Sequence, residues 1–427
     1  MVMHQSEFAL KDHNFLLETL VEDAVNLRSQ HCLDSKLINQ IKCFKPIRKF
    51  FSLSGLNAFL QENPEILEYP NAGIAGYVCY EGEMEFILYE EIKKNNTVEL
   101  ERGVNAESEI YERLRKQAKQ ECIVKDFSIK GFNGSEYIKK IQECQKYIEE
   151  GDIYQANISE KISWAESLSS DDVERLYKNL KEENPAPYSA FVNYSNYAIL
   201  SSSPESFLKI YPNRNARKNL EIGVCEQSHN WIIESSPIKG TADLTKKNEL
   251  LISEKEKAEH IMIIDLIRND LSRISKIGSV KVSEFMEIKK FKNLFHLVSK
   301  VSSAVNEKNL LEISSNKFQK TTLIPDLEKI FSATFPGGSI TGTPKIRAME
   351  VIKKLEGVKR GPYTGSIGYF KFHEGGEFNI IIRSLVYDKN KKELSFHSGA
   401  GITSGSNPEE ELKEIKLKAE KIYESLY

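Results

Sequence analysis

The segment at positions 256–267, which reads EKAEHIMIIDLI, opens with two glutamates three residues apart and continues as a nearly unbroken apolar run. In a helix of about 3.6 residues per turn, Glu256 and Glu259 lie about 60° apart around the axis and share one face. The apolar run must be largely buried, which places Glu259 at the edge of a hydrophobic core. A carboxylate there needs a partner, because burial of an unpaired charge is costly. The segment therefore predicts a helix over 248–274 with acidic side chains at a core boundary.

A second pair with the same spacing, Glu411 and Glu414, lies in the helical pattern of residues 408–427. Like charges on one helix face disfavour an isolated helix by roughly 0.2–0.5 kcal/mol per pair, so they require solvent or a cation. One interpretation is a solvated acidic face, which the flanking lysines favour. The other is a cation site, for which Mg²⁺ is the best candidate because it prefers oxygen ligands and keeps waters that bridge to an anionic ligand. Zinc is disfavoured because no cysteine or histidine ligands accompany these glutamates.

The composition is that of a folded, soluble protein with no excess of either charge. The chain has 427 residues, 40% of them hydrophobic and 28% charged, with a net charge of -3. This balance gives no electrostatic surface for nucleic acid, and we expect no nucleic-acid partner. The six cysteines are scattered without metal-ligand spacing, and no apolar stretch is long enough to span a membrane. We expect a cytoplasmic protein with reduced cysteines and no membrane association.

The chain divides into an N-terminal scaffold region, 1–125, and a region, 126–427, that carries the chemical motifs. In the first, the periodicity predicts a helix over 13–30 and strands over 76–80 and 85–89. In the second, helices are expected over 135–150 and 408–427, and strands over 188–194, 197–201, 206–211, 378–387 and 393–398. The predicted fold class is α/β, a large mixed sandwich of mainly antiparallel sheets flanked by helices.

Ten short motifs follow one another between residues 135 and 427. In chain order they are GDIYQ (151–155), SPESF (203–207), PIKGT (237–241), AEH with RNDL (258–260 and 268–271), HLVS (296–299), PGGSITGTPK (336–345), GPYTG (361–365), IRS (382–384), GAG (399–401) and ExxExxxKA (411–419). Together they make the chain resemble the chorismate-binding family of anthranilate, aminodeoxychorismate, isochorismate and salicylate synthases. The resemblance implies the fold of anthranilate synthase component I. It also implies a Mg²⁺ ion held by Glu256, Glu259, Glu411 and Glu414.

The resemblance also implies how the substrate is held. Arg383 matches a position that grips a carboxylate, as a guanidinium does in bidentate fashion, and Tyr363 and Lys418 match further carboxylate contacts. Gly399, Ala400 and Gly401 match a segment whose backbone N–H groups approach an anion, although without this context an ordinary tight turn is the simpler interpretation. Ser339 matches a small hydroxyl residue near the substrate ring. The loop that contains it is not a nucleotide phosphate loop, since Gly342 is followed by Thr-Pro-Lys.

Four positions bear on the reaction. Glu205 matches the general acid that protonates the departing ring hydroxyl, a role that a partly dry pocket favours by raising the pKa of a carboxyl group. A structural carboxylate that caps the turn after Pro204 is the alternative. Gln155 stands where isochorismate and salicylate synthases, which use water as the nucleophile, have a lysine that activates the water. A neutral amide cannot accept a proton in this way, so water is disfavoured as the nucleophile here. Lys239 matches a lysine of aminodeoxychorismate synthases, where anthranilate synthases usually have alanine, and a buried lysine can act as a nucleophile. A charge partner for a substrate carboxylate is the alternative role for Lys239. His296 matches an active-site histidine, with a structural histidine as the alternative.

These matches imply a component I of aminodeoxychorismate synthase, an enzyme of the transaminase class that serves folate and para-aminobenzoate biosynthesis. Lys239 would add to chorismate and ammonia would then displace it, giving 4-amino-4-deoxychorismate. No cysteine sits in a glycine-flanked turn of the glutamine-hydrolysing kind, so the ammonia is expected from a separate glutamine amidotransferase subunit. The alternatives are anthranilate synthase component I and an inactive chorismate-binding homologue. Ser236, which replaces an arginine common in relatives, and an apparent insertion over 213–230 are the departures from the family pattern.

Overall fold

The computed structural model describes residues 14–20, 35–100, 133–213, 231–243, 254–291, 294–315 and 320–426. Its strands are β1 (Asn14–Leu20), β2 (Ser35–Phe50), β3 (Gly73–Val78), β4 (Met84–Leu100), β5 (Gln155–Ala165), β6 (Tyr188–Asn193), β7 (Tyr197–Ser203), β8 (Ser206–Pro212), β9 (Trp231–Ser235), β10 (Ile238–Asp243), β11 (Lys281–Phe291), β12 (Leu294–Ala304), β13 (Leu310–Ser315), β14 (Lys320–Pro325), β15 (Gly342–Thr343), β16 (Ser366–Lys371), β17 (Gly375–Asn379), β18 (Ser384–Asp388) and β19 (Glu393–Ile402). Its α-helices are α1 (Leu53–Glu62), α3 (Gly134–Glu149), α4 (Ser170–Glu183), α6 (Glu254–Ser272), α7 (Leu327–Thr334), α8 (Lys345–Glu356) and α9 (Pro408–Glu424), with short 3-10 helices η3 (Pro64–Glu68), η6 (Glu307–Asn309) and η7 (Gly338–Ile340).

The main sheet is a continuous antiparallel network that folds back into two layers. The first layer runs β15–β5–β19–β18–β7–β6–β1. The second runs β4–β3–β16–β17–β8–β9–β12, with β10 and β11 also paired to β12. Strand β2 pairs with both β1 and β4 and so joins the layers. The prediction of a large antiparallel sandwich is confirmed.

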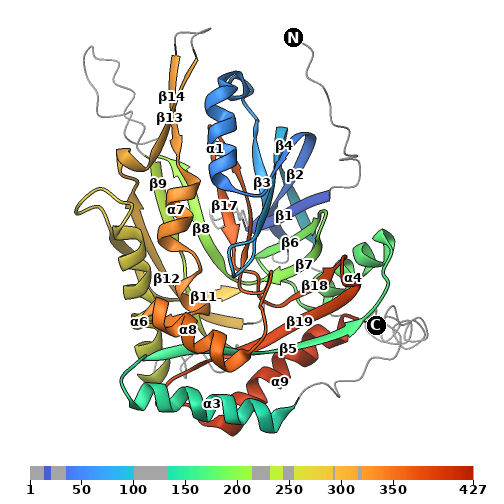
Figure 1. Cartoon of the computed structure of the whole chain (residues 1–427), viewed down its shortest axis with the longest axis vertical. Helices are drawn as coiled ribbons and strands as arrows, with labels where there is room; N and C mark the ends of the chain where they lie inside the picture. Colours follow the sequence, from blue (N-terminus) through green and yellow to red (C-terminus); the bar gives the residue numbers. More distant parts are fainter. Residues whose placement is uncertain are drawn as a thin grey trace.

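Apolar side chains fill the space between the two layers. Leu17 of β1 and Val192 of β6 belong to the same buried cluster as Ile87 of β4 and Tyr369 of β16. Successive side chains of a strand point to opposite faces, so the apolar side chains on the outer face of each layer must also pack against another element. Helices provide this cover (Figure 1).

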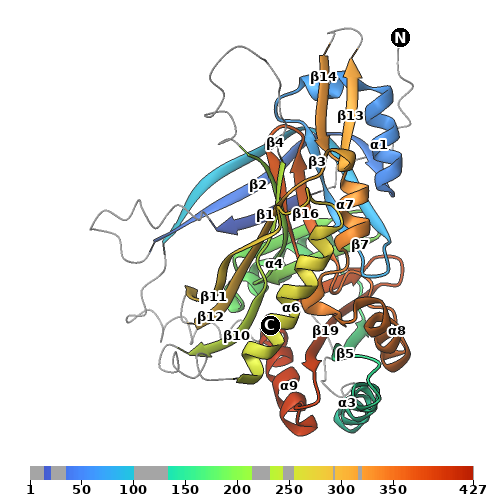
Figure 2. The ribbon, with the colours of Figure 1, turned by 90° about the vertical axis from the view of Figure 1, so that its left-hand side faces the viewer.

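The helices lie on the outer faces of the two layers. Helices α3, α8 and α9 pack on β5 and β19, and α4 packs on β7. On the other side, α6 packs against β10 and β12 and contacts α7, and α1 lies against α7 and the β13–β14 pair (Figure 2). No helix of the described segments is long and apolar enough to cross a membrane.

Local signals explain several helix boundaries. Asn133 caps α3 by accepting a hydrogen bond from the Glu136 N–H, and Gly151 follows the helix with φ of 80°, which glycine adopts without strain. Ser169 and Asp172 form a reciprocal capping box at the start of α4. Asn407 caps α9, whose first turn carries three glutamates that interact favourably with the helix dipole.

Two sequence predictions about the fold are wrong. Within the helix predicted over 13–30, residues 14–20 form β1, because alternate residues Phe15 and Leu17 are buried by pairing with β2 and β6. The remainder of that range lies outside the described residues, as do the domain boundary at 125–126 and the insertion over 214–230. The single strand predicted over 378–387 is two strands, because Arg383 adopts φ of 51°, which no strand accommodates.

The cysteines that can be placed carry free thiols. Cys79 and Cys144 are buried, and Cys43 is partly buried. Burial raises the pKa of all three thiols above its ordinary value, so they are poor nucleophiles. They take no part in the site described below.

Replacement of Phe378 by alanine tests the packing of the second layer against α7. Phe378 is 1% exposed, and its ring meets that of Phe331 edge-on with centroids 5.1 Å apart. The change should lower the free energy of unfolding by about 3–5 kcal/mol, seen as a lower denaturant midpoint. Phe285→Ala removes a ring that is 57% exposed and should change it by no more than about 0.5 kcal/mol. Equal losses in the two variants would contradict this packing.

Candidate active site

The two layers approach each other where Gly401 of β19 lies beneath the side chains of Gln155 and Lys239. Gln155 begins β5, and Lys239 is the second residue of β10 in the other layer. A Cβ atom on Gly401 would lie 2.7 Å from the Gln155 amide nitrogen and 3.4 Å from the Lys239 amine nitrogen. Glycine at this position therefore leaves the space that both polar groups occupy. The structure brings together three residues that the sequence placed in one site.

Lys239 also contacts the first predicted acidic pair. Its Nζ atom lies 3.1 Å from Oε2 of Glu259 on α6. Glu259 is buried and Lys239 is about one-fifth exposed. Helix α6 is fixed locally by His260, whose Nε2 hydrogen-bonds the Ser299 hydroxyl at 2.7 Å, and burial lowers the pKa of this histidine to about 4. The predicted nucleophile and a predicted metal ligand thus form one ion pair.

Glu205 lies between β7 and β8 in a buried position. Burial raises the pKa of its carboxyl group from the usual 4.5 to about 7, although a hydrogen bond with Ser339 and the charges of Lys239 and Arg383 act in the opposite direction. The carboxyl group also accepts a hydrogen bond from the Ile238 N–H. A cavity beside Glu205 is bounded by Ser339, by α6 and by the loop that follows α7. A carboxyl with this pKa is protonated often enough at neutral pH to donate a proton.

Arg383 and Tyr363 belong to two turns that meet at the backbone. The Thr364 N–H donates to the Ile381 carbonyl at 2.7 Å. Burial lowers the pKa of Arg383, and the nearby Glu205 charge opposes this change. Tyr363 is buried, with its ring stacked on that of His397 at a centroid distance of 4.5 Å, and burial raises the pKa of its phenol to about 12. Both groups are therefore hydrogen-bond donors at neutral pH.

The Gly399–Gly401 segment is a strand, so the alternative of an ordinary tight turn is wrong. Strand β19 pairs with β5 over residues 393–402, whereas β18 pairs only with residues 393–396. Residues 397–402 therefore have one edge without a strand partner among the described residues, and glycine lets an anion approach such an edge. Ala400 points the other way, into the apolar cluster under α3 and α8. Lys418 of α9 donates to the Gly399 carbonyl at 3.2 Å.

The second acidic pair lies at the start of α9. Glu411 is buried and accepts a hydrogen bond from the Ser406 hydroxyl at 2.8 Å, whereas Glu414 is half exposed and forms an ion pair with Lys418 at 2.6 Å. The Glu256 side chain lies outside the described residues. Among the side chains that are described, no three from His, Cys, Asp and Glu gather into a metal-binding cluster. The donor chemistry suits Mg²⁺, since the candidate ligands are carboxylate oxygens.

Two further predicted features are only partly placed. His296 lies on β12 opposite Thr241 of β10, but its side chain is outside the described residues. Ser236 is partly buried between β9 and β10, three residues before Lys239. The role expected for His296 stays a prediction.

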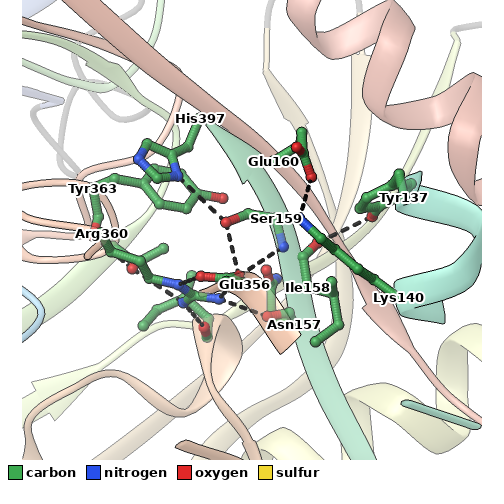
Figure 3. A network of polar contacts seen from close by, with 12 residues as sticks. Tyr137, Lys140, Asn157, Ile158, Ser159, Glu160, Glu356, Arg360, Tyr363 and His397 are labelled. Carbon is green, nitrogen blue, oxygen red and sulfur yellow. Dashed lines mark hydrogen bonds and ion pairs between the residues drawn. The ribbon is translucent and has the colours of Figure 1, made fainter. Parts of the chain in front are cut away.

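Two buried ion pairs near the site were not predicted from the sequence. Lys345 donates to Asp270 at 2.6 Å and to the Thr334 and Pro336 carbonyls, and so holds the loop that carries Ser339 against α6. Arg360 and Glu356 form the second pair, beneath Tyr363 (Figure 3). Lysine and arginine side chains are mostly exposed in proteins. The burial of Lys345 and Arg360 could therefore have been inferred only from the residues around them, in PGGSITGTPK and next to GPYTG.

Comparisons with known proteins agree with this architecture. The family model described as "chorismate binding enzyme" matches residues 58–424. Aminodeoxychorismate synthase component 1 of Bacillus subtilis is 36% identical over 67% of this chain and 55% of its own length. Anthranilate synthase component 1 of Saccharolobus solfataricus is also 36% identical, over 69% of this chain and 63% of its own length. The chain thus spans little more than half the length of these relatives. The crystal structure of anthranilate synthase component I from Streptococcus pneumoniae superposes with a TM-score of 0.63 at 23% identity, covering 94% of this chain and 96% of that one.

Glu205→Gln should remove a pH-dependent loss of stability. Between about pH 4.5 and 7 the folded protein keeps a proton on Glu205 that the unfolded chain has lost. The wild type therefore loses stability as pH rises through this window, by on the order of 3 kcal/mol, and the loss levels off above the folded pKa. Denaturant unfolding of both proteins at several pH values measures the difference, which should grow in favour of the variant as pH rises. The exposed Glu312→Gln is the control. A difference for Glu205→Gln that does not change with pH would contradict the buried, high-pKa carboxyl.

Proposed function

The chain belongs to the chorismate-binding enzyme family, and from this membership we propose that it is component I of an aminodeoxychorismate synthase. Such an enzyme converts chorismate and ammonia to 4-amino-4-deoxychorismate. The observation that carries the proposal is the Lys239 amine, which lies over Gly401 beside the Gln155 amide. An amide cannot take a proton from water, so the amine is the better nucleophile in this part of the site.

The proposed reaction starts with attack of Lys239 on ring carbon C2. As the C2–N bond forms and the ring double bonds shift, the C4–O bond breaks, and Glu205 gives its proton to the departing hydroxyl, which leaves as water. The raised pKa of Glu205 supports this role. The ion pair with Glu259 favours the protonated amine, so Lys239 must release a proton before it attacks.

Ammonia completes the exchange in the second half of the reaction. It attacks C4, the double bonds shift back, and the C2–N bond to Lys239 breaks. The new C4 ammonium then loses one proton, which restores the acid. The net change replaces a hydroxyl with an amine and releases water, while the enolpyruvyl group stays on the ring.

The remaining candidate residues would hold the substrate. Arg383 and Tyr363 are donors suited to a carboxylate, and the free edge of β19 at Gly399 and Gly401 offers backbone N–H groups beside Lys418. Ser339, which hydrogen-bonds Glu205, would lie against the ring. His296 would lie near the ring on β12.

Glu256, Glu259, Glu411 and Glu414 would hold Mg²⁺. The ion would neutralise a substrate carboxylate and fix its position when bound. The carboxylate chemistry of these four side chains supports this assignment, since Mg²⁺ prefers oxygen ligands.

The ammonia would come from a glutamine amidotransferase subunit. The words "component 1" in the names of the relatives support a partner. Among the described residues, Cys43, Cys79 and Cys144 have thiols with raised pKa values, which makes them poor nucleophiles for glutamine hydrolysis. Free ammonium should replace the partner in an assay at a pH that keeps some ammonia neutral.

Anthranilate synthase component I is the second candidate. A relative with that name is as similar, at 36% identity, as the one with the favoured name. In that reaction the enolpyruvyl group leaves as pyruvate. The product therefore separates the two candidates directly.

Incubation with chorismate, Mg²⁺ and ammonium should yield 4-amino-4-deoxychorismate without pyruvate, identified by mass and by a pyruvate assay. Lys239→Ala should lower turnover by about 10³-fold or more, because it removes the attacking atom. Lys276→Ala, which removes a lysine paired with Glu307 on the surface, should leave turnover unchanged. Release of pyruvate would refute the favoured reaction, and full activity of Lys239→Ala would refute its covalent step.

Glu411→Gln should raise the Mg²⁺ concentration for half-maximal activity by about tenfold or more, because it removes one charged oxygen ligand. A magnesium titration of turnover measures this, and calorimetry with Mg²⁺ measures binding without turnover. Glu410→Gln changes an exposed neighbour in the same helical turn and serves as the matched control. If both variants respond to Mg²⁺ as the wild type does, Glu411 is not a ligand.

A further inference from the structure

Arg360 and Glu356 form an ion pair that is almost completely removed from solvent. Their side chains are 1% and 2% exposed. Glu356 is the last residue of α8, and the guanidinium reaches it through two parallel bonds, Nη2 to Oε1 at 2.7 Å and Nε to Oε2 at 2.9 Å (Figure 3). Burial of two charges in a protein needs excellent geometry and further hydrogen bonds to offset the loss of hydration.

The further bonds of Glu356 reach the first layer of the sandwich. Oε1 accepts from both the backbone N–H of Ser159, at 2.8 Å, and its hydroxyl, at 2.9 Å. Ser159 is the strand partner of Gly399 across β5 and β19. The carboxylate therefore fixes the strand beside the glycine edge.

The further bonds of Arg360 reach two other segments. Nη1 donates to the Ile340 carbonyl at 3.0 Å, one residue after Ser339. Nη1 also donates to the Thr364 hydroxyl at 3.2 Å, and this hydroxyl donates to the Tyr363 carbonyl at 2.6 Å. Thr364 has φ of 57°, an unfavourable conformation for a β-branched residue that surrounding contacts must maintain.

The N-terminal region secures the same loop from the other side. Arg360 lies over the ring of Tyr80, 4.6 Å from its centroid. The Glu81 carboxylate accepts from the backbone N–H groups of Arg360, at 2.8 Å, and Gly361, at 3.0 Å. The turn between β3 and β4 thus holds the start of the GPYTG loop.

We propose that Arg360 and Glu356 are a positioning pair that sets the spacing of the groups that bind chorismate. Ser339, Tyr363 and Gly399 come from three separate segments. Ser339 and Tyr363 are the sequence neighbours of Ile340 and Thr364, which Arg360 hydrogen-bonds. Gly399 pairs across the sheet with Ser159, which Glu356 hydrogen-bonds. The inference rests on the proposed use of chorismate at this site. Since binding groups must be placed to within a fraction of an ångström, loosening the pair should weaken substrate binding.

Glu356→Gln is the direct test, with Glu160→Gln as the matched control. Glu160 follows Ser159 on β5, points to the opposite face and pairs with Lys140 at 2.8 Å, with both side chains 14% exposed (Figure 3). Each variant loses the negative charge of a largely buried ion pair: Glu356 contacts Ser159, and Glu160 is the next residue of β5. Equilibrium binding of chorismate, measured by calorimetry on full-length folded protein, should weaken by about tenfold or more for Glu356→Gln and by less than about twofold for Glu160→Gln.

Ser159→Ala provides a milder variant if Glu356→Gln does not fold. It keeps both charges and removes only the hydroxyl, so chorismate binding should weaken by about threefold. Non-additive effects of two substitutions on chorismate binding give a readout that a loss of stability alone would not produce. In a Tyr363→Phe background, the effect of Glu356→Gln on chorismate binding should shrink, because Arg360, the partner of Glu356, holds the Thr364 hydroxyl that contacts the Tyr363 carbonyl.

The outcomes separate this inference from the proposed function. If the wild type binds chorismate and Glu356→Gln or Ser159→Ala binds it equally well, the positioning role is overturned while the proposed function stands. Strictly additive effects of Glu356→Gln and Tyr363→Phe would also overturn it. If the wild type itself does not bind chorismate, the proposed function and this inference fail together.

Discussion

The contact between Lys239 and Glu259 depends on the way one antiparallel network folds back on itself. Lys239 lies on β10 at one end of the strand order, and Gly401 lies on β19 near the other end. Apolar packing between the layers, in the cluster that includes Leu17 and Tyr369, brings these ends together. Helix α6 then adds Glu259 from outside the second layer. Each part of the candidate site is therefore a consequence of the sandwich closing over its apolar interior.

Charge is distributed unevenly in the interior that results. Among the described residues, Glu205 has no ion-pair partner at hydrogen-bonding distance, and its burial raises the pKa of its carboxyl group. Glu356 is buried with four donors around it. The first environment suits a group that gives up and regains a proton. The second suits a group that must stay charged and fixed. The two buried glutamates therefore suit the different roles proposed for them, proton transfer for Glu205 and positioning for Glu356.

The sequence predicted the parts of the fold that local patterns control. The helix that carries Glu259, the capped helix that carries Glu411 and the antiparallel strands from β6 to β8 all follow from periodicity and turn residues. The helix predicted over 13–30 was wrong for residues 14–20, because pairing with β2 and β6 outweighs local propensity. The break at Arg383 could not be predicted, since its left-handed conformation depends on contacts between distant segments. The same holds for Arg360 and Glu356, whose role depends on partners far away in the sequence.

Covalent participation of Lys239 is the central claim about the site. The most direct measurement is the intact mass of the protein after incubation with chorismate and Mg²⁺ in the absence of ammonia, followed by peptide mapping. The account predicts an added mass equal to chorismate minus water, located on Lys239. An unmodified protein that still converts chorismate and ammonium to 4-amino-4-deoxychorismate, or an adduct on another residue, would contradict it.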